Sequence, residues 1–125
     1  MLKFTIPIKP ITKKNSQQIV VNQKTGKPFI IPSKAYKQYE KDVGYFIKGK
    51  GLNIDYAVNV KATYYMPTKR KVDLTNLHEA LHDILVKYEV LADDNYTVIA
   101  TTDGSTVRVD KANPRTEVEI TTRDE

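Results

Sequence analysis

Alternating hydrophobic and polar positions divide the chain into short predicted strands and two amphipathic helices. Residues 4–8 alternate with period two, which predicts a strand with one buried face. A polar loop over 9–17 follows it. The stretch 17–31 then predicts a hairpin that turns around Thr25 and Gly26.

The next segment predicts an amphipathic helix. Ser33 is a favourable N-cap, and Gly49 or Gly51 is expected to end the helix. The hydrophobic positions recur at helical spacing: Tyr36, Tyr39, Val43, Phe46 and Ile47. Lysines between them predict a basic outer face. The tyrosines of this helix, Tyr45 included, are expected to face the core.

A longer strand and a second helix follow. Period-two alternation predicts a strand from Tyr56 to Tyr64 that Pro67 ends, and helical periodicity predicts a helix from about Thr75 to Tyr88. One side of this helix is hydrophobic: Leu74, Leu77, Ala80, Leu81, Ile84, Leu85 and Tyr88. The opposite side is polar: Asn76, Glu79 and Asp83.

The last part of the chain predicts strands only. The segment 96–102 and the alternations around 107–109 and 118–120 are joined by a turn at 103–105 and by a loop at Pro114. The whole order predicts a single α+β domain over residues 1–125, in which two helices pack on one mixed β-sheet.

The two parts of the chain differ in charge. Residues 1–72 carry a net charge of +12 and residues 73–125 a net charge of −7, which together give +5. A basic half is typical of a surface for a polyanion, and an acidic half offers ligands for metal ions. The alternative is that the lysines only solvate strand and helix faces.

Composition narrows the chemistry further. The chain has no cysteine, which excludes disulfides, cysteine-ligated zinc and a thiol nucleophile, so a metal would be held by oxygen or by the two histidines. No stretch approaches the roughly 18 apolar residues of a membrane span, and the start does not fit a secretory signal. We therefore expect a cytoplasmic protein without a membrane partner.

Carboxylates bracket the second helix. Asp73 stands at its start, and Asp93 and Asp94 follow its end. Each is by itself an ordinary cap or turn residue, but two or three convergent carboxylates would place Mg²⁺ on a phosphodiester. The predicted helix is about 20 Å long, so Asp94 either returns along it or meets Asp73 across a dimer. The sequence leaves both routes open.

Two loops carry the candidate contacts to a nucleic-acid backbone. The first loop contributes Lys13, Lys14 and Asn15, and the second contributes Lys69, Arg70 and Lys71. The second loop leads directly into Asp73, which suits phosphate held close to a carboxylate-bound cation.

The second helix also contains a zinc-peptidase pattern. His78, Glu79 and His82 match H-E-x-x-H, with two imidazoles on one helix face and a glutamate as base. No third histidine is present, and the favoured interpretation is a pair of exposed histidines at the edge of the polar side.

The stretch 72–94 resembles the RusA family of crossover (Holliday) junction endodeoxyribonucleases, which are small phage and prophage enzymes. That family has an Asp-x-Asp-Asn-Leu signature, a helix with an inner aspartate and an Asp-Asp pair downstream. Position by position, these features fall on Asp73, Asn76, Leu77, Asp83, Asp93 and Asp94. The order of elements agrees along nearly the whole chain.

Two positions depart from the family pattern. Thr75 stands where the family has its second aspartate, and Glu79 stands where a basic residue is common. The first change removes a metal ligand, and we expect Glu79, on the same side of the helix as Asn76 and Asp83, to replace part of it. If Glu79 does not, the protein would bind junctions and cut them poorly.

The resemblance implies a RusA-like fold and a homodimer that resolves four-way DNA junctions by paired phosphodiester hydrolysis, in recombination and repair. The implied cofactor is Mg²⁺, with Mn²⁺ as the alternative. The expected catalytic residues are Asp73, Asp94, Asp93 and Glu79; the metal ligands are Asp73, Asp94, Asp83 and Glu79; and Asn76 joins the DNA contacts. The implied location is the cytoplasm of a bacterium or a phage-infected cell. The second candidate function is an inactive junction-binding protein, and the third is the zinc peptidase.

Overall fold

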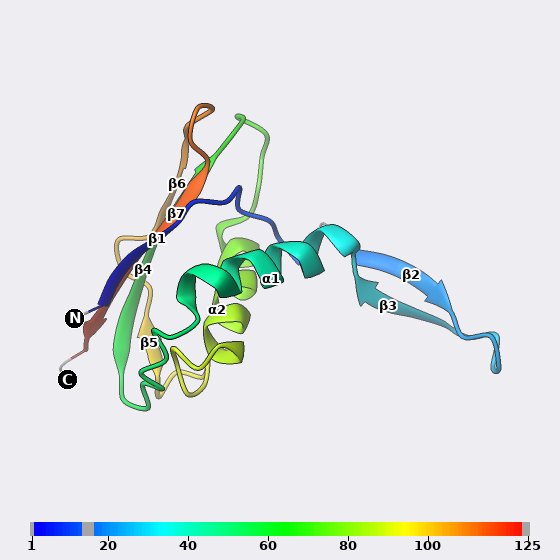
Figure 1. Ribbon diagram of the computed structural model, residues 1–125, viewed down its shortest axis with the longest axis horizontal. Helices are drawn as coiled ribbons and strands as arrows, with labels where there is room; N and C mark the ends of the chain where they lie inside the picture. Colours follow the sequence, from blue (N-terminus) through cyan, green and yellow to red (C-terminus); the bar gives the residue numbers. More distant parts are fainter. Residues whose placement is uncertain (1, 14–16, 124–125) are drawn as a thin grey trace.

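The computed structural model of the protein describes residues 2–13 and 17–123. A five-stranded mixed sheet forms one layer, and both helices lie on the same face of it (Figure 1), which confirms the predicted α+β architecture. The strands of this sheet are β1 (Leu2–Ile6), β4 (Val58–Met66), β5 (Ile99–Thr101), β6 (Thr106–Val109) and β7 (Arg115–Thr122). None of the described helices is long and apolar enough to cross a membrane.

Strand β4 lies at the centre of the sheet. It pairs antiparallel with β7, which pairs antiparallel with β1. On its other edge β4 pairs in parallel with β5 and then with β6, so these two short strands follow one another along one edge. The predicted turn at 103–105 joins them: Gly104 has φ +86°, and the Ser105 hydroxyl accepts a hydrogen bond from the backbone N–H of Ala62 at 3.0 Å.

Two strands are shorter than the sequence predicts. Strand β4 begins at Val58, and Tyr56 before it is 49% exposed. Strand β5 covers only Ile99–Thr101, because Tyr96 and its neighbours form a turn that precedes the strand. Hydrophobic and polar residues alternate in both regions. Each strand starts only where a neighbouring strand offers a pairing partner, as Val58 of β4 and Ile99 of β5 do for each other.

Helix α1 (Lys34–Ile47) begins where the sequence predicts. The Ser33 hydroxyl accepts a hydrogen bond from the backbone N–H of Tyr36 at 3.1 Å, which satisfies one of the unpaired donors of the first turn. The expected burial of Tyr45 is wrong, because its side chain is 78% exposed. It lies two positions, about 200°, from the fully buried Val43 and therefore points away from the sheet.

Helix α2 (Leu74–Lys87) packs its hydrophobic side on the sheet. The side chains of Leu77, Leu81, Ile84 and Leu85 are at most 1% exposed. They form one core with the inward residues of the sheet and of α1: Phe4, Ile6, Tyr36, Tyr39, Val43, Ile47, Val58, Val60, Ala62, Tyr64, Val118 and Ile120. The helices are close, because a Cβ on Gly44 would lie 2.4 Å from the Tyr88 ring. This packing turns the polar side of α2 outward.

The two histidines of α2 are not exposed, contrary to expectation. His78 is 9% exposed and His82 is half-buried, and their rings stack with centroids 5.2 Å apart and planes 10° apart. The Tyr64 hydroxyl of β4 lies 2.7 Å from Nδ1 of His78. Burial raises the pKa of Tyr64, so this hydroxyl stays protonated and shares a hydrogen bond with the ring. The buried side of α2 therefore includes these two histidines as well as the aliphatic residues.

The predicted hairpin is present as a separate two-stranded sheet. Strand β2 (Gln17–Val21) pairs antiparallel with β3 (Pro28–Pro32). The turn closes with the N–H of Gly26 donating to the carbonyl of Asn22 at 2.8 Å, and Gly26 has φ +71°. The hairpin extends away from the rest of the molecule beyond the start of α1 (Figure 1).

Truncation of Ile84 is expected to destabilise the fold strongly. The side chain is 0% exposed in the core under α2, so Ile84→Ala should lower the free energy of unfolding by ~2–5 kcal/mol through lost burial and a cavity. Urea unfolding measures the change. The exposed Lys41→Ala on α1 is the matched control, with an expected change within ~0.5 kcal/mol. Equal losses in both variants would contradict the described core.

The stacked histidines should make the fold sensitive to acid. Burial lowers the pKa of His78, and burial, reinforced by His78 and opposed by Asp83, lowers the pKa of His82 to about 4. Below the unfolded value of 6.5 the unfolded chain binds more protons, so stability should fall as pH drops from 6.5 toward 4, by at most ~1.4 kcal/mol per pH unit for each histidine. Urea unfolding at pH 7 and pH 5 tests this, and His82→Gln should flatten the slope. An unchanged slope would assign the effect to other groups.

Candidate active site

The start of α2 presents a carboxylate that the helix does not use. Asp73 occupies the N-cap position, yet its side chain makes no capping hydrogen bond to the backbone. The carboxylate is exposed and accepts a hydrogen bond from Nδ2 of Asn76 at 3.3 Å. Capping, the ordinary explanation for an aspartate here, therefore does not account for this side chain.

The third turn of α2 carries an ion pair with the first loop. Nζ of Lys13 lies 3.0 Å from Oδ2 of Asp83, and both side chains are about one-third exposed (35% and 33%). The same ammonium lies 6.0 Å from the centre of the Tyr36 ring. Lys13 is expected to contact DNA, but here it neutralises a predicted metal ligand. A cation that approaches Asp83 would compete with Lys13.

The two aspartates after α2 have different roles. Oδ1 of Asp93 accepts a hydrogen bond from the backbone N–H of Asp94 at 2.7 Å, and this bond lowers the pKa of Asp93. Partial burial, then the side-chain hydrogen bond with Asp93 and the negative charge of Asp83, raises the pKa of Asp94. Asp93 thus stabilises the turn. The carboxylate of Asp94 is instead partly desolvated and lies near the negative charges of Asp83 and Asp93.

One chain does not gather all the predicted ligands. Asp73 and Asp83 are ten residues apart on α2, or about 15 Å along its axis. Glu79 is exposed one turn before Asp83 on the same side of the helix, and Asp94 lies within electrostatic range of Asp83. Within 2–13 and 17–123, no three His, Asp or Glu side chains converge closely enough to hold a metal ion.

A basic groove lies beside the start of α2. It has a volume of about 650 Å³ and is lined by the first loop, the start of α1 and the loop before α2. Its cations are Lys9, Arg70 and Lys71, and Asp73 directly follows Val72, the last residue of this lining. Lys9 was not singled out in the sequence, although it belongs to the same lysine-rich loop as Lys13.

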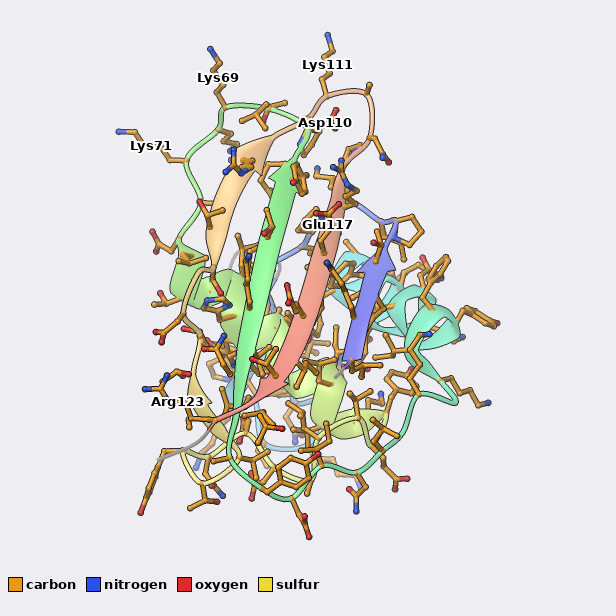
Figure 2. All side chains as sticks on the ribbon, turned by 90° about the vertical axis from the view of Figure 1, so that its left-hand side faces the viewer. Lys69, Lys71, Asp110, Lys111, Glu117 and Arg123 are labelled. Atoms are coloured by element: carbon orange, nitrogen blue, oxygen red, sulfur yellow. The ribbon has the colours of Figure 1, made fainter. Side chains whose placement is uncertain are left out.

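The other predicted DNA contacts in the described residues do not line the groove. Lys69 extends into solvent from the loop after β4, at the end of the molecule that also carries Lys111 (Figure 2). Asn76 is half-buried and bonded to Asp73. Lys14 and Asn15 lie outside the described residues.

The face of the sheet that the helices leave uncovered is a poor candidate for DNA (Figure 2). The Arg115 guanidinium lies 3.7 Å from the centre of the Tyr65 ring and pairs with Asp110 at 2.8 Å and Glu117 at 3.1 Å. The shallow hollow on this face mixes Lys3 and Lys61 with two glutamates. These charges cancel one another, so the basic groove is the stronger site for a polyanion.

The histidine geometry argues against a zinc peptidase. A catalytic zinc keeps one position open to substrate. The Nε2 atoms of His78 and His82 are buried, the rings stack face to face, and Nδ1 of His78 is bound to Tyr64. The H-E-x-x-H spacing here reflects core packing, and Glu79 alone of the three is exposed.

Comparison with known proteins adds one match. The family model described as endodeoxyribonuclease RusA matches residues 7–121. No curated protein matches the chain. The matched region contains the basic groove, both helices and every predicted carboxylate. Because the match spans most of the 125 residues, the chain belongs to the endodeoxyribonuclease RusA family.

Proposed function

We propose that the protein is a Mg²⁺-dependent endodeoxyribonuclease that resolves four-way DNA junctions by hydrolysing phosphodiester bonds. The observation that carries the proposal is the basic groove of Lys9, Arg70 and Lys71, whose lining ends at Val72, one residue before the uncapped carboxylate of Asp73. The cations would hold the phosphates of the DNA backbone, and the carboxylate of Asp73 would hold the metal ion that assists hydrolysis of the phosphodiester.

The donor set fits Mg²⁺ better than a softer metal. All candidate ligands are carboxylate oxygens, and Mg²⁺ takes one or two of these and completes its shell with water and phosphate oxygen. We expect Asp73 and Asp94 to be the principal ligands, with Asp83 and Glu79 in support. Because Asp73 and Asp83 are about 15 Å apart along α2, one ion cannot contact both of them within a single chain. When bound, the ion neutralises charge that develops on the phosphate and activates water. Mn²⁺, with the same oxygen preference, is the alternative.

The protein's own residues supply binding and orientation. Lys9, Arg70 and Lys71 would hold consecutive phosphates, and Asn76 orients the carboxylate of Asp73 through its side-chain amide. Desolvation is the main cause of the raised pKa of Asp94, and the smaller contributions from Asp83 and Asp93 also favour a cation beside it. A homodimer would present two such sites to a nearly two-fold junction. The reaction would serve DNA recombination and repair in the cytoplasm.

A second candidate function is a junction-binding protein with little or no activity. Thr75 removes one carboxylate from the family signature, and Lys13 already neutralises Asp83. Both features lower the number of negative ligands that are ready for a metal. A labelled four-way junction with Mg²⁺ separates the two functions, since an inactive protein would retard the DNA on a gel without cutting it.

Loss of either principal carboxylate should stop cleavage but not binding. Asp73→Asn and Asp94→Asn should each lower the rate of junction nicking by ~10²-fold or more, because a hard anionic ligand is lost. Binding in EDTA should stay the same or tighten, because less negative charge repels phosphate. The exposed Asp55→Asn is the matched control and should cut normally. Normal cleavage by Asp73→Asn or Asp94→Asn would refute the assignment.

Removal of the groove cations should weaken binding and reduce its dependence on salt. Each phosphate contact contributes a slope of about −0.9 in log K against log salt, so Lys9→Ala with Arg70→Ala and Lys71→Ala should flatten the slope by about 2–3. Fluorescence anisotropy with a junction over a salt series measures it. Lys48→Ala with Lys50→Ala, at the far end of α1, should leave the slope unchanged. Identical slopes for the wild type and the groove variant would place the DNA elsewhere.

A further inference from the structure

One ion pair joins the loop of the basic groove to the acidic side of α2. Residues 9–12 line the groove, and Lys13 follows them directly. Its Nζ lies 3.0 Å from Oδ2 of Asp83, which is 70 positions further along the chain. The lysine that follows the groove lining is therefore bound to a predicted metal ligand.

This ion pair is weak enough to be exchanged for another. Both side chains are about one-third exposed, and ion pairs at such positions contribute little to stability. The ring of Tyr36, whose centre lies 6.0 Å from Nζ, adds only a weak attraction at this distance. A divalent ion carries twice the charge of an ammonium and prefers carboxylate oxygen, so it would displace Lys13 from Asp83.

The position of Asp83 gives such an exchange a reason. Asp83 lies near enough to Asp94 to act on it electrostatically. In the metal-free protein the ammonium of Lys13 offsets part of this repulsion between carboxylates. A divalent ion between the same carboxylates would offset it more strongly, so Lys13 would then no longer be needed there.

The backbone before Lys13 is fixed, whereas its side chain is flexible. Thr12 is 5% exposed, so the chain is anchored in the fold at this point. Lys13 itself ends in an ammonium on a flexible four-carbon stem. After release from Asp83, this ammonium would stay beside the groove, where Lys9 and the cations of the second loop are expected to hold phosphates.

We propose that Lys13 contacts DNA only after a divalent ion has replaced its ammonium at Asp83. In the metal-free protein the carboxylate of Asp83 holds Lys13 away from phosphate. In the loaded protein the ammonium transfers to a phosphate of the DNA in the groove. Metal ion and DNA therefore each raise the affinity for the other, because one frees the cation that the other takes up. This inference rests on the proposed function, since it needs both DNA in the groove and an ion at Asp83.

Junction binding in EDTA tests the proposal without metal and without cleavage. Asp83→Asn removes the carboxylate that holds Lys13, so the freed lysine should add one phosphate contact and steepen the plot of log K against log salt by about 0.9. Fluorescence anisotropy over a salt series measures the slope. Glu79→Gln is the matched control, because it removes the same charge one turn earlier on α2 while Lys13 stays paired with Asp83.

A second substitution assigns the added contact to Lys13. Lys13→Ala alone should leave the slope in EDTA as in the wild type, and Lys13→Ala with Asp83→Asn should abolish the steepening. A wild-type slope in Asp83→Asn, equal steepening in Glu79→Gln or steepening that persists in the double variant would each overturn the proposal. A protein with the expected slopes that does not cut junctions would refute the nuclease and support this inference. A protein that does not bind junctions would refute both.

Binding of Mn²⁺ to the DNA-free protein gives an independent test. Lys13→Ala removes the cation that competes for Asp83, so it should bind Mn²⁺ about 2–5-fold more tightly than the wild type. Electron paramagnetic resonance of the free ion measures this affinity. Lys3→Ala, which removes the same charge from the sheet face that the helices leave uncovered, is the matched control and should bind as the wild type does. Equal affinities of the wild type and Lys13→Ala, or no binding by either, would overturn the proposal.

Discussion

The packing of α2 on the sheet is the contact on which the rest of the molecule depends. Five of its side chains are at most 1% exposed and meet the inward residues of β4, β7 and α1. Because the helix can turn only one side inward, its other side, with Asp73, Glu79 and Asp83, is held toward solvent in a fixed order. Burial of apolar surface therefore positions the charged groups of the site.

Several of these carboxylates are neutralised or hydrogen-bonded by neighbouring residues. Lys13 pairs with Asp83, Asn76 bonds to Asp73, and Asp93 is committed to a turn. Asp94 is the carboxylate whose pKa is raised by its surroundings. The lining of the basic groove ends at Val72, so a phosphate in the groove would lie next to the segment that leads into Asp73 and α2. This meeting of charges suits an enzyme of the family better than either surface alone.

The carboxylates of one chain do not form a compact metal site. They are spread along α2 and beyond it, with no group of three in the described residues, and Lys13 already neutralises Asp83. Separately, the β2–β3 hairpin exposes more than half of each of the side chains of Ile19, Val21 and Ile30 to solvent.

The sequence by itself determined the elements whose signals are local. The turn at Thr25 and Gly26, the Ser33 cap and the hydrophobic side of α2 follow from short-range spacing, and each is where the pattern predicts it. The tertiary structure alone decided the contacts between distant segments. Lys13 meets Asp83 across 70 positions and Tyr64 meets His78 across the sheet–helix interface. Periodicity describes one element at a time, so it cannot reveal which surface another element covers or which charge it neutralises.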